Sequence, residues 1–277
     1  MTTQVAKARA FRELHERQGA FLIPNPFDLG SLRILEGLGF EALATTSAGL
    51  AFSLGRQDGG ATREDVIEHC RALCANSSLP ISADLGIGFG ESPESAAETV
   101  RLAAAAGLVG CSLEDTPPMG QGGALPFELS VERIQAAVEA ARRLPHDFVL
   151  TARCEHLAYG GKDLKPVLER LEAFQAAGAD VLYAPGVRDP ETIRTLCASV
   201  DKPVNVLIGF RGITLGLEEL EALGVKRVSV GVMLARSAYS AVLKAAQVLK
   251  QTGRAHDASQ EARSVELAKY FAGRDRS

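Results

Sequence analysis

The feature that most limits what this chain can fold into is a helix-forming stretch followed by a short apolar run, repeated eight times. Glycine marks four of the junctions at which a helix gives way to the next apolar run, at Gly39, Gly107, Gly178 and Gly224. Glycine is common there because it adopts positive φ without a Cβ clash. The alternation predicts strands at residues 21–24, 42–46, 79–84, 108–114, 148–153, 180–184, 203–208 and 227–231.

Eight apolar strands alternating with helices are typical of a parallel (β/α)8 barrel. The length of 277 residues suits one barrel domain, which takes roughly 250 residues. We therefore predict a single domain over residues 1–277, with an N-terminal helix at 1–19 and a C-terminal helical extension at 234–277. A doubly wound open sheet is the alternative. It gains no support from the glycines at 86, 88 and 90, because a dinucleotide-binding fingerprint has other spacing and follows the first strand.

Composition excludes several classes of partner. The net charge is −4, and 30 basic and 34 acidic residues are interspersed, so we expect no nucleic-acid-binding face. No apolar run reaches the roughly 18 residues of a membrane helix, so we expect no membrane association. The five cysteines are odd in number and scattered, which predicts reduced thiols, and the N-terminus reads as a charged helix. These features predict a cytoplasmic protein with a small-molecule partner.

The predicted strand ends carry polar groups that suit a shared site. A barrel assembles its active site at the C-terminal ends of its strands. There the chain places Asp84 before a glycine-rich loop, Glu114 with Asp115, and Arg153. Carboxylates at two neighbouring tips suggest Mg²⁺, which prefers oxygen ligands, and an arginine neutralises an anion. Each side chain alone has a structural explanation, as a cap or an ion-pair partner, but that explanation must hold for all of them at one end of consecutive strands.

Five segments together resemble the phosphoenolpyruvate mutase/isocitrate lyase superfamily. They are Thr46-Ser47-Ala48-Gly49-Leu50, Gly55-Arg56-Gln57-Asp58, Ala83-Asp84 through Gly88-Phe89-Gly90, Leu113-Glu114-Asp115 and Thr151-Ala152-Arg153. The resemblance covers residues from about 20 to 250, in the family's order. It implies a (β/α)8 barrel, a homo-oligomer (a dimer or tetramer) with C-terminal helices exchanged between protomers, and a Mg²⁺-dependent site for 2-oxo acids and related carboxylates.

The resemblance also implies roles for single residues. Asp84 is similar to the direct Mg²⁺ ligand, and Asp58 and Glu114 to the acids that hold the ion through water. Arg153 resembles the arginine that binds the substrate's oxo or carboxylate oxygen, and with Asp58 it is the expected catalytic residue. The substrate's 1-carboxylate is expected at Ser47, Ala48 and Gly49. Asn205 lies at a strand tip where relatives contact the distal end of the substrate.

Two departures from the family pattern bear on the chemistry. The metal loop of relatives carries a second acid two residues after the first, where this chain has Gly86. The loop after the fourth strand carries a Lys-Lys-Cys-Gly-His motif in the lyases, whereas residues 116–124 here contain no cysteine, lysine or histidine. Lyase cleavage needs an acid for the departing carbanion, so the missing cysteine removes a necessary group.

Decarboxylation of a 3-carboxy-2-oxo acid needs fewer groups, because Mg²⁺ and Arg153 on the 2-oxo oxygen stabilise the enolate as CO₂ leaves. The leading hypothesis is therefore a Mg²⁺-dependent enzyme of oxaloacetate-decarboxylase type, acting on a small 2-oxo dicarboxylate. The alternatives are a 2-methylisocitrate-type carbon–carbon lyase, phosphonopyruvate-type P–C chemistry, and a non-catalytic protein that binds a 2-oxo acid such as 2-oxoglutarate. His156 is a candidate proton donor, although a polar loop residue is the expectation we favour.

Overall fold

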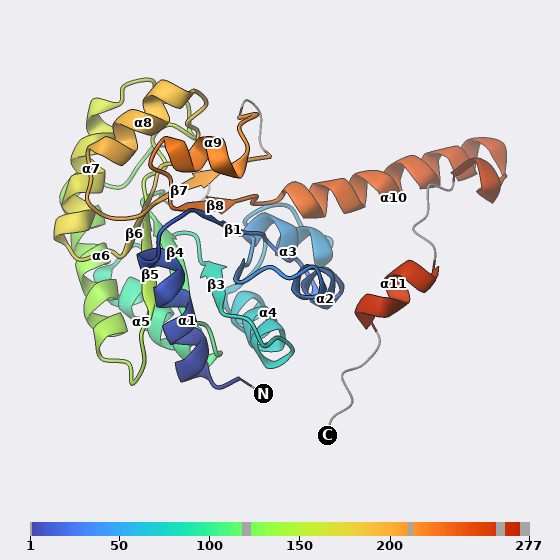
Figure 1. The fold of residues 1–277 in the computed structure, drawn as a ribbon, viewed down its shortest axis with the longest axis horizontal. Coiled ribbons are helices and arrows are strands. Elements are labelled where there is room, and N and C mark those ends of the chain that lie inside the picture. The colour runs from blue at the N-terminus through green and yellow to red at the C-terminus, as the bar shows by residue number, and fades with distance from the viewer. Residues whose placement is uncertain (1, 118–122, 210–212, 259–263, 272–277) are drawn as a thin grey trace.

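Eight parallel strands form the centre of the protein in this computed structural model, which describes residues 2–117, 123–209, 213–258 and 264–271 (Figure 1). Their bounds are β1 Phe21–Ile23, β2 Leu43–Ala44, β3 Ile81–Asp84, β4 Gly110–Glu114, β5 Val149–Arg153, β6 Val181–Tyr183, β7 Val204–Leu207 and β8 Arg227–Ser229. All eight predicted strands are confirmed. Neighbours along the chain pair from β2 to β8, and β8 pairs with β1. This order confirms the (β/α)8 barrel and excludes the open sheet, in which the strand order reverses.

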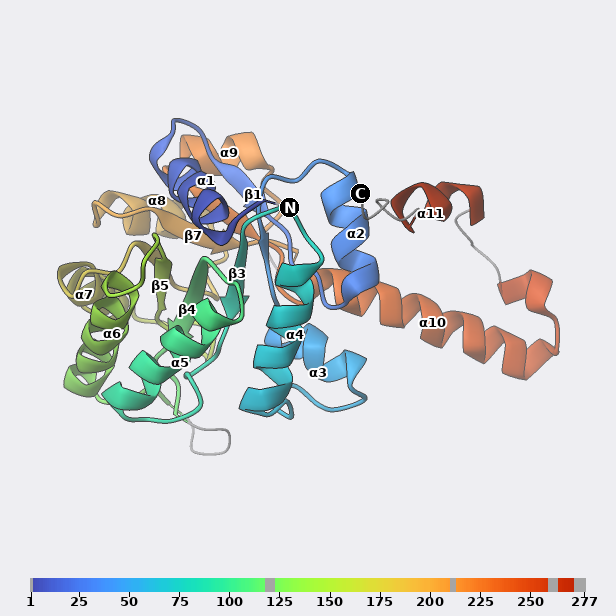
Figure 2. The ribbon, with the colours of Figure 1, turned by 90° about the horizontal axis from the view of Figure 1, so that it is seen from below.

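Helices alternate with the strands around the barrel (Figures 1 and 2). Their bounds are α1 Gln4–Glu16, α2 Leu29–Gly37, α3 Ser47–Ser53, α4 Arg63–Ala75, α5 Pro93–Ala105, α6 Phe127–Arg142, α7 Lys165–Ala176, α8 Pro190–Ala198, α9 Leu217–Ala222, α10 Met233–Thr252, the 3₁₀ helix η1 Ala255–Ala258 and α11 Ser264–Phe271. The four junction glycines have φ of +87° to +100°, as the C-cap prediction requires, at Gly39, Gly107, Gly178 and Gly224.

The N-terminal helix α1 closes the end of the barrel at which the strands begin. Its side chains Phe11 and Leu14 are buried in a cluster with Val109, Val149 and Val181, each at or just before the start of a strand. The first strand adds Phe21 to the same cluster. Because this end is filled by apolar side chains, the opposite end, where the strands finish, is left for the site.

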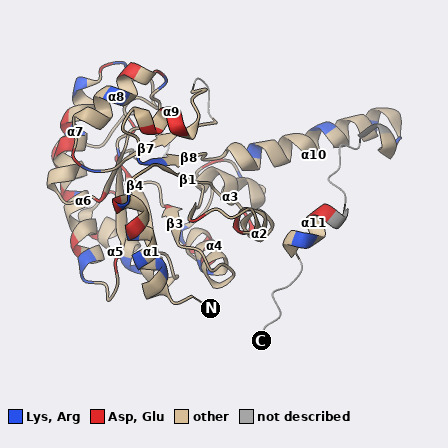
Figure 3. Ribbon diagram, in the orientation of Figure 1, with Lys and Arg blue, Asp and Glu red and all other residues tan. Residues whose placement is uncertain are grey.

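The two helices of the C-terminal extension are placed differently. Helix α10 projects outward from the barrel, whereas α11 lies beside α2, where a Cβ on Gly37 would be 2.5 Å from the ring of Tyr270 (Figures 1 and 2). Only Ala235 is buried along the 20 residues of α10. None of the described helices combines the length and the apolarity that a membrane span requires. Acidic and basic side chains are mixed over the barrel helices (Figure 3).

Candidate active site

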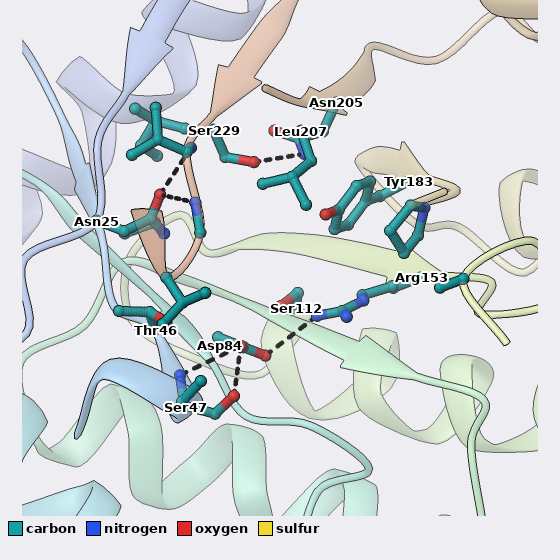
Figure 4. A pocket seen from close by; sticks show the side chains of 18 of the residues that line it. Asn25, Thr46, Ser47, Asp84, Ser112, Arg153, Tyr183, Asn205, Leu207 and Ser229 are labelled. Carbon is teal, nitrogen blue, oxygen red and sulfur yellow. Dashed lines mark hydrogen bonds and ion pairs between the residues drawn. The ribbon is translucent and has the colours of Figure 1, made fainter. Parts of the chain in front are cut away.

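The guanidinium of Arg153 lies at the centre of the candidate site, between the carboxylates of two neighbouring strand ends. Figure 4 shows its ion pair with one of them, Asp84. Its Nη1 atom is 3.5 Å from Oδ1 of Asp84 and 3.3 Å from Oε2 of Glu114. These residues end β5, β3 and β4, and Glu114 and Arg153 are partners in the strand register. The structure therefore brings together three of the four charged residues that the strand-end argument selected, and leaves out Asp115.

Two further side chains hold Arg153 in place. Its Nε atom donates to the buried carboxylate of Glu155, and its guanidinium lies 5.2 Å from the centre of the Tyr183 ring. Although burial opposes the charged form, Glu114 and Glu155 raise the pKa of Arg153 well above its ordinary value, so it is cationic throughout the physiological range. Arg153 is thus a fixed positive charge with a fixed orientation.

The segment expected to bind a carboxylate begins a helix. Ser47 is the first residue of α3, and its hydroxyl donates to Oδ2 of Asp84 at 2.9 Å. The backbone N–H of Gly49 donates to the capping hydroxyl of Thr46 at 3.3 Å, so that group is already used. A Cβ on Gly49 would lie 2.9 Å from Cβ of Phe27, which explains the need for glycine at this position.

Asp58 lies in the loop between α3 and α4 and faces the same cavity as Asp84. Burial, and then the charge of Asp84, raise the pKa of Asp58. Burial likewise raises the pKa of Glu114, and Asp84 adds to the effect. Asp84, Glu114 and Glu155 form ion pairs with the one guanidinium of Arg153, and Asp58 faces the same cavity. The negative charge of the site therefore exceeds its positive charge.

This surplus of negative charge and the all-oxygen donor set fit a hard divalent cation. In the part of the chain that the structure describes, no three histidine, cysteine, aspartate or glutamate side chains converge on one point where a metal ion would be held. Among the described residues, at most two such side chains could therefore contact one ion directly.

Three other residues named from the sequence lie outside this charged centre. Asn205 is 2 % exposed, and its amide donates to Ser229 and accepts from Nε of Arg227 at 2.9 Å. Asp115 points away from the cavity, accepting from the backbone of Glu155 and pairing with Arg170 at 3.2 Å. The ring of His156 folds back onto its own loop, where a Cβ on Gly161 would lie 2.3 Å from Nε2.

A cavity of about 410 Å³ extends from the charged centre into the barrel, and a second hollow of about 470 Å³ adjoins it on the Gly86 side. Both are lined by Asp58, Asp84 and Arg153. Sequence reasoning missed Tyr183 and Arg227, which line the first cavity. A signal existed for Arg227, since it is a charged residue at the start of a predicted apolar strand.

The fold and this geometry define a class: a (β/α)8-barrel enzyme that gathers carboxylates and one arginine at its strand ends, as lyases and mutases of anionic substrates do. The family model for phosphoenolpyruvate phosphomutase matches residues 11–250. The chain therefore belongs to the phosphoenolpyruvate mutase family, within the phosphoenolpyruvate mutase/isocitrate lyase superfamily, and the resemblance seen in the sequence is confirmed.

Relatives in this superfamily are carbon–carbon lyases and mutases. The 2-methylisocitrate lyase of Escherichia coli is 31% identical over 71% of this chain and 68% of its own. The oxaloacetate decarboxylase of Chromohalobacter salexigens is 29% identical over 85% of this chain and 81% of its own. A crystal structure from Burkholderia cenocepacia J2315, provisionally assigned as a lyase/mutase, is 49% identical over 99% of this chain and 98% of its own, with a TM-score of 0.94.

Proposed function

We propose that this protein is a Mg²⁺-dependent decarboxylase of a small 2-oxo dicarboxylate, of oxaloacetate-decarboxylase type. The observation that carries the proposal is Arg153, a half-buried guanidinium fixed between Asp84 and Glu114 where the cavity opens. Loss of CO₂ from such a substrate leaves negative charge on the 2-oxo oxygen, and a fixed positive charge beside that oxygen stabilises the enolate.

Each residue of the site has a separate role in the proposed reaction. Asp84 would hold Mg²⁺ directly, with Asp58 and Glu114 holding it through water, and the ion would supply Lewis-acid stabilisation of the 2-oxo oxygen. Arg153 orients that oxygen, and Glu155 and Tyr183 keep the guanidinium in position. The 1-carboxylate would be received at Ser47 and Ala48, because the N–H of Gly49 already donates to Thr46.

The loop after β4 supports decarboxylation over cleavage of a larger carbon skeleton. Its described residues near the acids are Thr116, Pro117 and Gly123, which line the second hollow with Glu114. Residues 118–122 lie outside the described part of the chain, and their sequence contains no cysteine, lysine or histidine. A decarboxylase needs no protein base to begin, so this composition does not prevent the reaction.

The test is CO₂ release from oxaloacetate with and without Mg²⁺, in the wild-type protein and in Asp84→Asn. We expect Mg²⁺-stimulated release well above the spontaneous rate, and a loss of the stimulation in the variant. Asp201→Asn is the matched control, because Asp201 is an exposed acid near the start of β7, at the opposite end of the barrel. Stimulation that survives in Asp84→Asn would refute the metal assignment.

Carbon–carbon cleavage of 2-methylisocitrate is a second candidate, favoured by the relative in Escherichia coli. That reaction yields pyruvate and succinate, so a pyruvate assay with 2-methylisocitrate separates it from decarboxylation. Phosphonopyruvate and 2-oxoglutarate complete the screen, since binding of the latter without turnover of any compound would indicate a 2-oxo acid binding protein.

The setting of the reaction is part of the proposal. Four of the five cysteines are buried as free thiols, which suits the reducing cytoplasm.

We also propose a homo-oligomer, a dimer or tetramer, in which the C-terminal helices are exchanged between protomers. The support is the exposed apolar surface of α10.

A further inference from the structure

Beneath the charged centre, the barrel interior holds an arginine whose charge no carboxylate balances. Arg227, on β8, is 5 % exposed. It donates from Nε to Asn205 at 2.9 Å and from Nη2 to Thr151 on the far strand β5 at 2.8 Å, and Nη1 is 3.5 Å from Nε2 of His15. Within the described residues, no aspartate or glutamate forms an ion pair with Arg227.

The neighbouring histidine does not supply the missing charge. Nδ1 of His15 lies 2.7 Å from the carbonyl oxygen of Phe11, and burial, together with Arg227, lowers the pKa of His15 to about 3. His15 is therefore neutral and accepts from Arg227. Burying a guanidinium without a counter-ion costs several kcal/mol, and the three hydrogen-bond partners of Arg227 are all neutral. We therefore expect an anionic ligand to bind next to Arg227.

The cavity reaches this arginine. Its lining includes Arg227, Asn205, Ser112 and Tyr183, and Ser112 is partly exposed although it lies in the middle of β4. The hydroxyls of Ser112 and Tyr183 have no hydrogen-bond partner among the described side chains or backbone. Figure 4 shows the phenol oxygen of Tyr183 pointing into the open space of the cavity. Two free donors and one unbalanced cation thus surround the inner end of the cavity.

We infer that the inner end of the cavity is a carboxylate subsite, in which Ser112 and Tyr183 donate hydrogen bonds and Arg227 supplies the balancing charge. The inference rests on the proposed function, which fixes the 2-oxo end of the ligand at Arg153. The ligand that fits both sites is therefore a 2-oxo acid that carries a second carboxylate, at the end away from Arg153.

The test compares two five-carbon probes that differ only at the distal end, 2-oxoglutarate and 2-oxopentanoate, by calorimetric titration of the Mg²⁺-loaded protein. We expect the wild type to bind 2-oxoglutarate roughly tenfold more tightly, the factor expected of charge-assisted hydrogen bonds. In Arg227→Gln, which retains a donor for Asn205, the ratio should fall close to one while 2-oxopentanoate binds as before. A purely structural role would weaken both probes together.

Arg188→Gln is the matched control, because it removes the same charge from an exposed residue lining the same cavity. We expect Arg188→Gln to keep the wild-type ratio of affinities for the two probes. If Arg188→Gln loses this preference and Arg227→Gln keeps it, the subsite assignment is wrong. If Arg227→Gln fails to fold, Ser112→Ala and Tyr183→Phe test the subsite in its place. Each is expected to lower the preference for 2-oxoglutarate over 2-oxopentanoate. Equal binding of both probes by a wild type that decarboxylates oxaloacetate would refute the subsite alone. A tenfold ratio without CO₂ release would refute the decarboxylase alone.

Discussion

At the scale of single residues, Gly86 lies two positions after Asp84, the residue proposed to hold the metal. The backbone there has φ of +52°, its N–H donates to Oδ1 of Asp84 at 3.3 Å, and an added Cβ would meet no atom within 4 Å. Aspartate and asparagine tolerate this left-handed conformation better than most residues. The position is therefore open, in space and in conformation, to an acidic side chain.

We predict that Gly86→Asp tightens Mg²⁺ binding about tenfold, since a second carboxylate near the ion adds at least about 1.4 kcal/mol of attraction. Titration of Mg²⁺ followed by calorimetry measures the change. Gly86→Asn is the control, because it introduces the same backbone strain and nearly the same shape without the charge. Equal affinities in the two variants would show that the ion does not bind beside this loop.

Part of the site was predictable from the sequence. Asp84, Glu114 and Arg153 end predicted strands, and parallel strands bring their ends together, so their meeting follows from the alternation alone. The burial of Asn205 against Arg227 does not follow from it. It depends on the strand register and on a side chain that crosses the barrel to Thr151, and neither is encoded in a local pattern.

At the scale of elements, helix α6 positions the loop that follows β3. Its buried Arg133 donates to the carbonyl oxygens of Ile87 and Gly90, the latter at 2.6 Å, and lies 3.3 Å from that of Ser92. These bonds cross from one βα unit to the next. They satisfy carbonyl groups in a loop where Phe89, although not a glycine, has φ of +59°. The conformation of the proposed metal loop therefore depends on α6.

We predict that Arg133→Gln lowers the free energy of unfolding by about 2–4 kcal/mol, because it leaves buried carbonyl groups unpaired. It should also weaken Mg²⁺ binding, since the loop carrying Gly86 loses its support. Urea unfolding and Mg²⁺ titration measure the two effects. Arg101→Gln on the neighbouring α5 removes an exposed ion pair with Glu98 and should change stability by less than about 1 kcal/mol. If Arg133→Gln is destabilised but binds Mg²⁺ with unchanged affinity, the loop after β3 does not contribute to metal binding.

At the scale of the whole molecule, α10 lacks the packing that a long helix needs. It extends away from the barrel, and Val242, Leu243 and Leu249 are 64%, 59% and 48% exposed (Figure 1). Near its start, Tyr239 lies against the rings of Phe27 and Phe52, so the apolar face begins on the protein's own barrel and continues outward. Sequence periodicity predicted helices in this part of the chain, but a local pattern cannot show which surface packs against them. Most helical stability comes from tertiary packing, so this face requires a partner.

We predict that a second copy of this chain covers that face, and that Leu243→Glu therefore lowers the oligomeric state. Burying the new carboxylate without a partner costs several kcal/mol, which is enough to dissociate an interface at micromolar concentration. Light scattering after size-exclusion chromatography gives the mass directly. Lys244→Glu, turned about 100° around the same helix, is the control and should keep the wild-type mass. A monomeric wild type at tens of micromolar would refute the prediction, and it would leave the apolar face of α10 for a different protein.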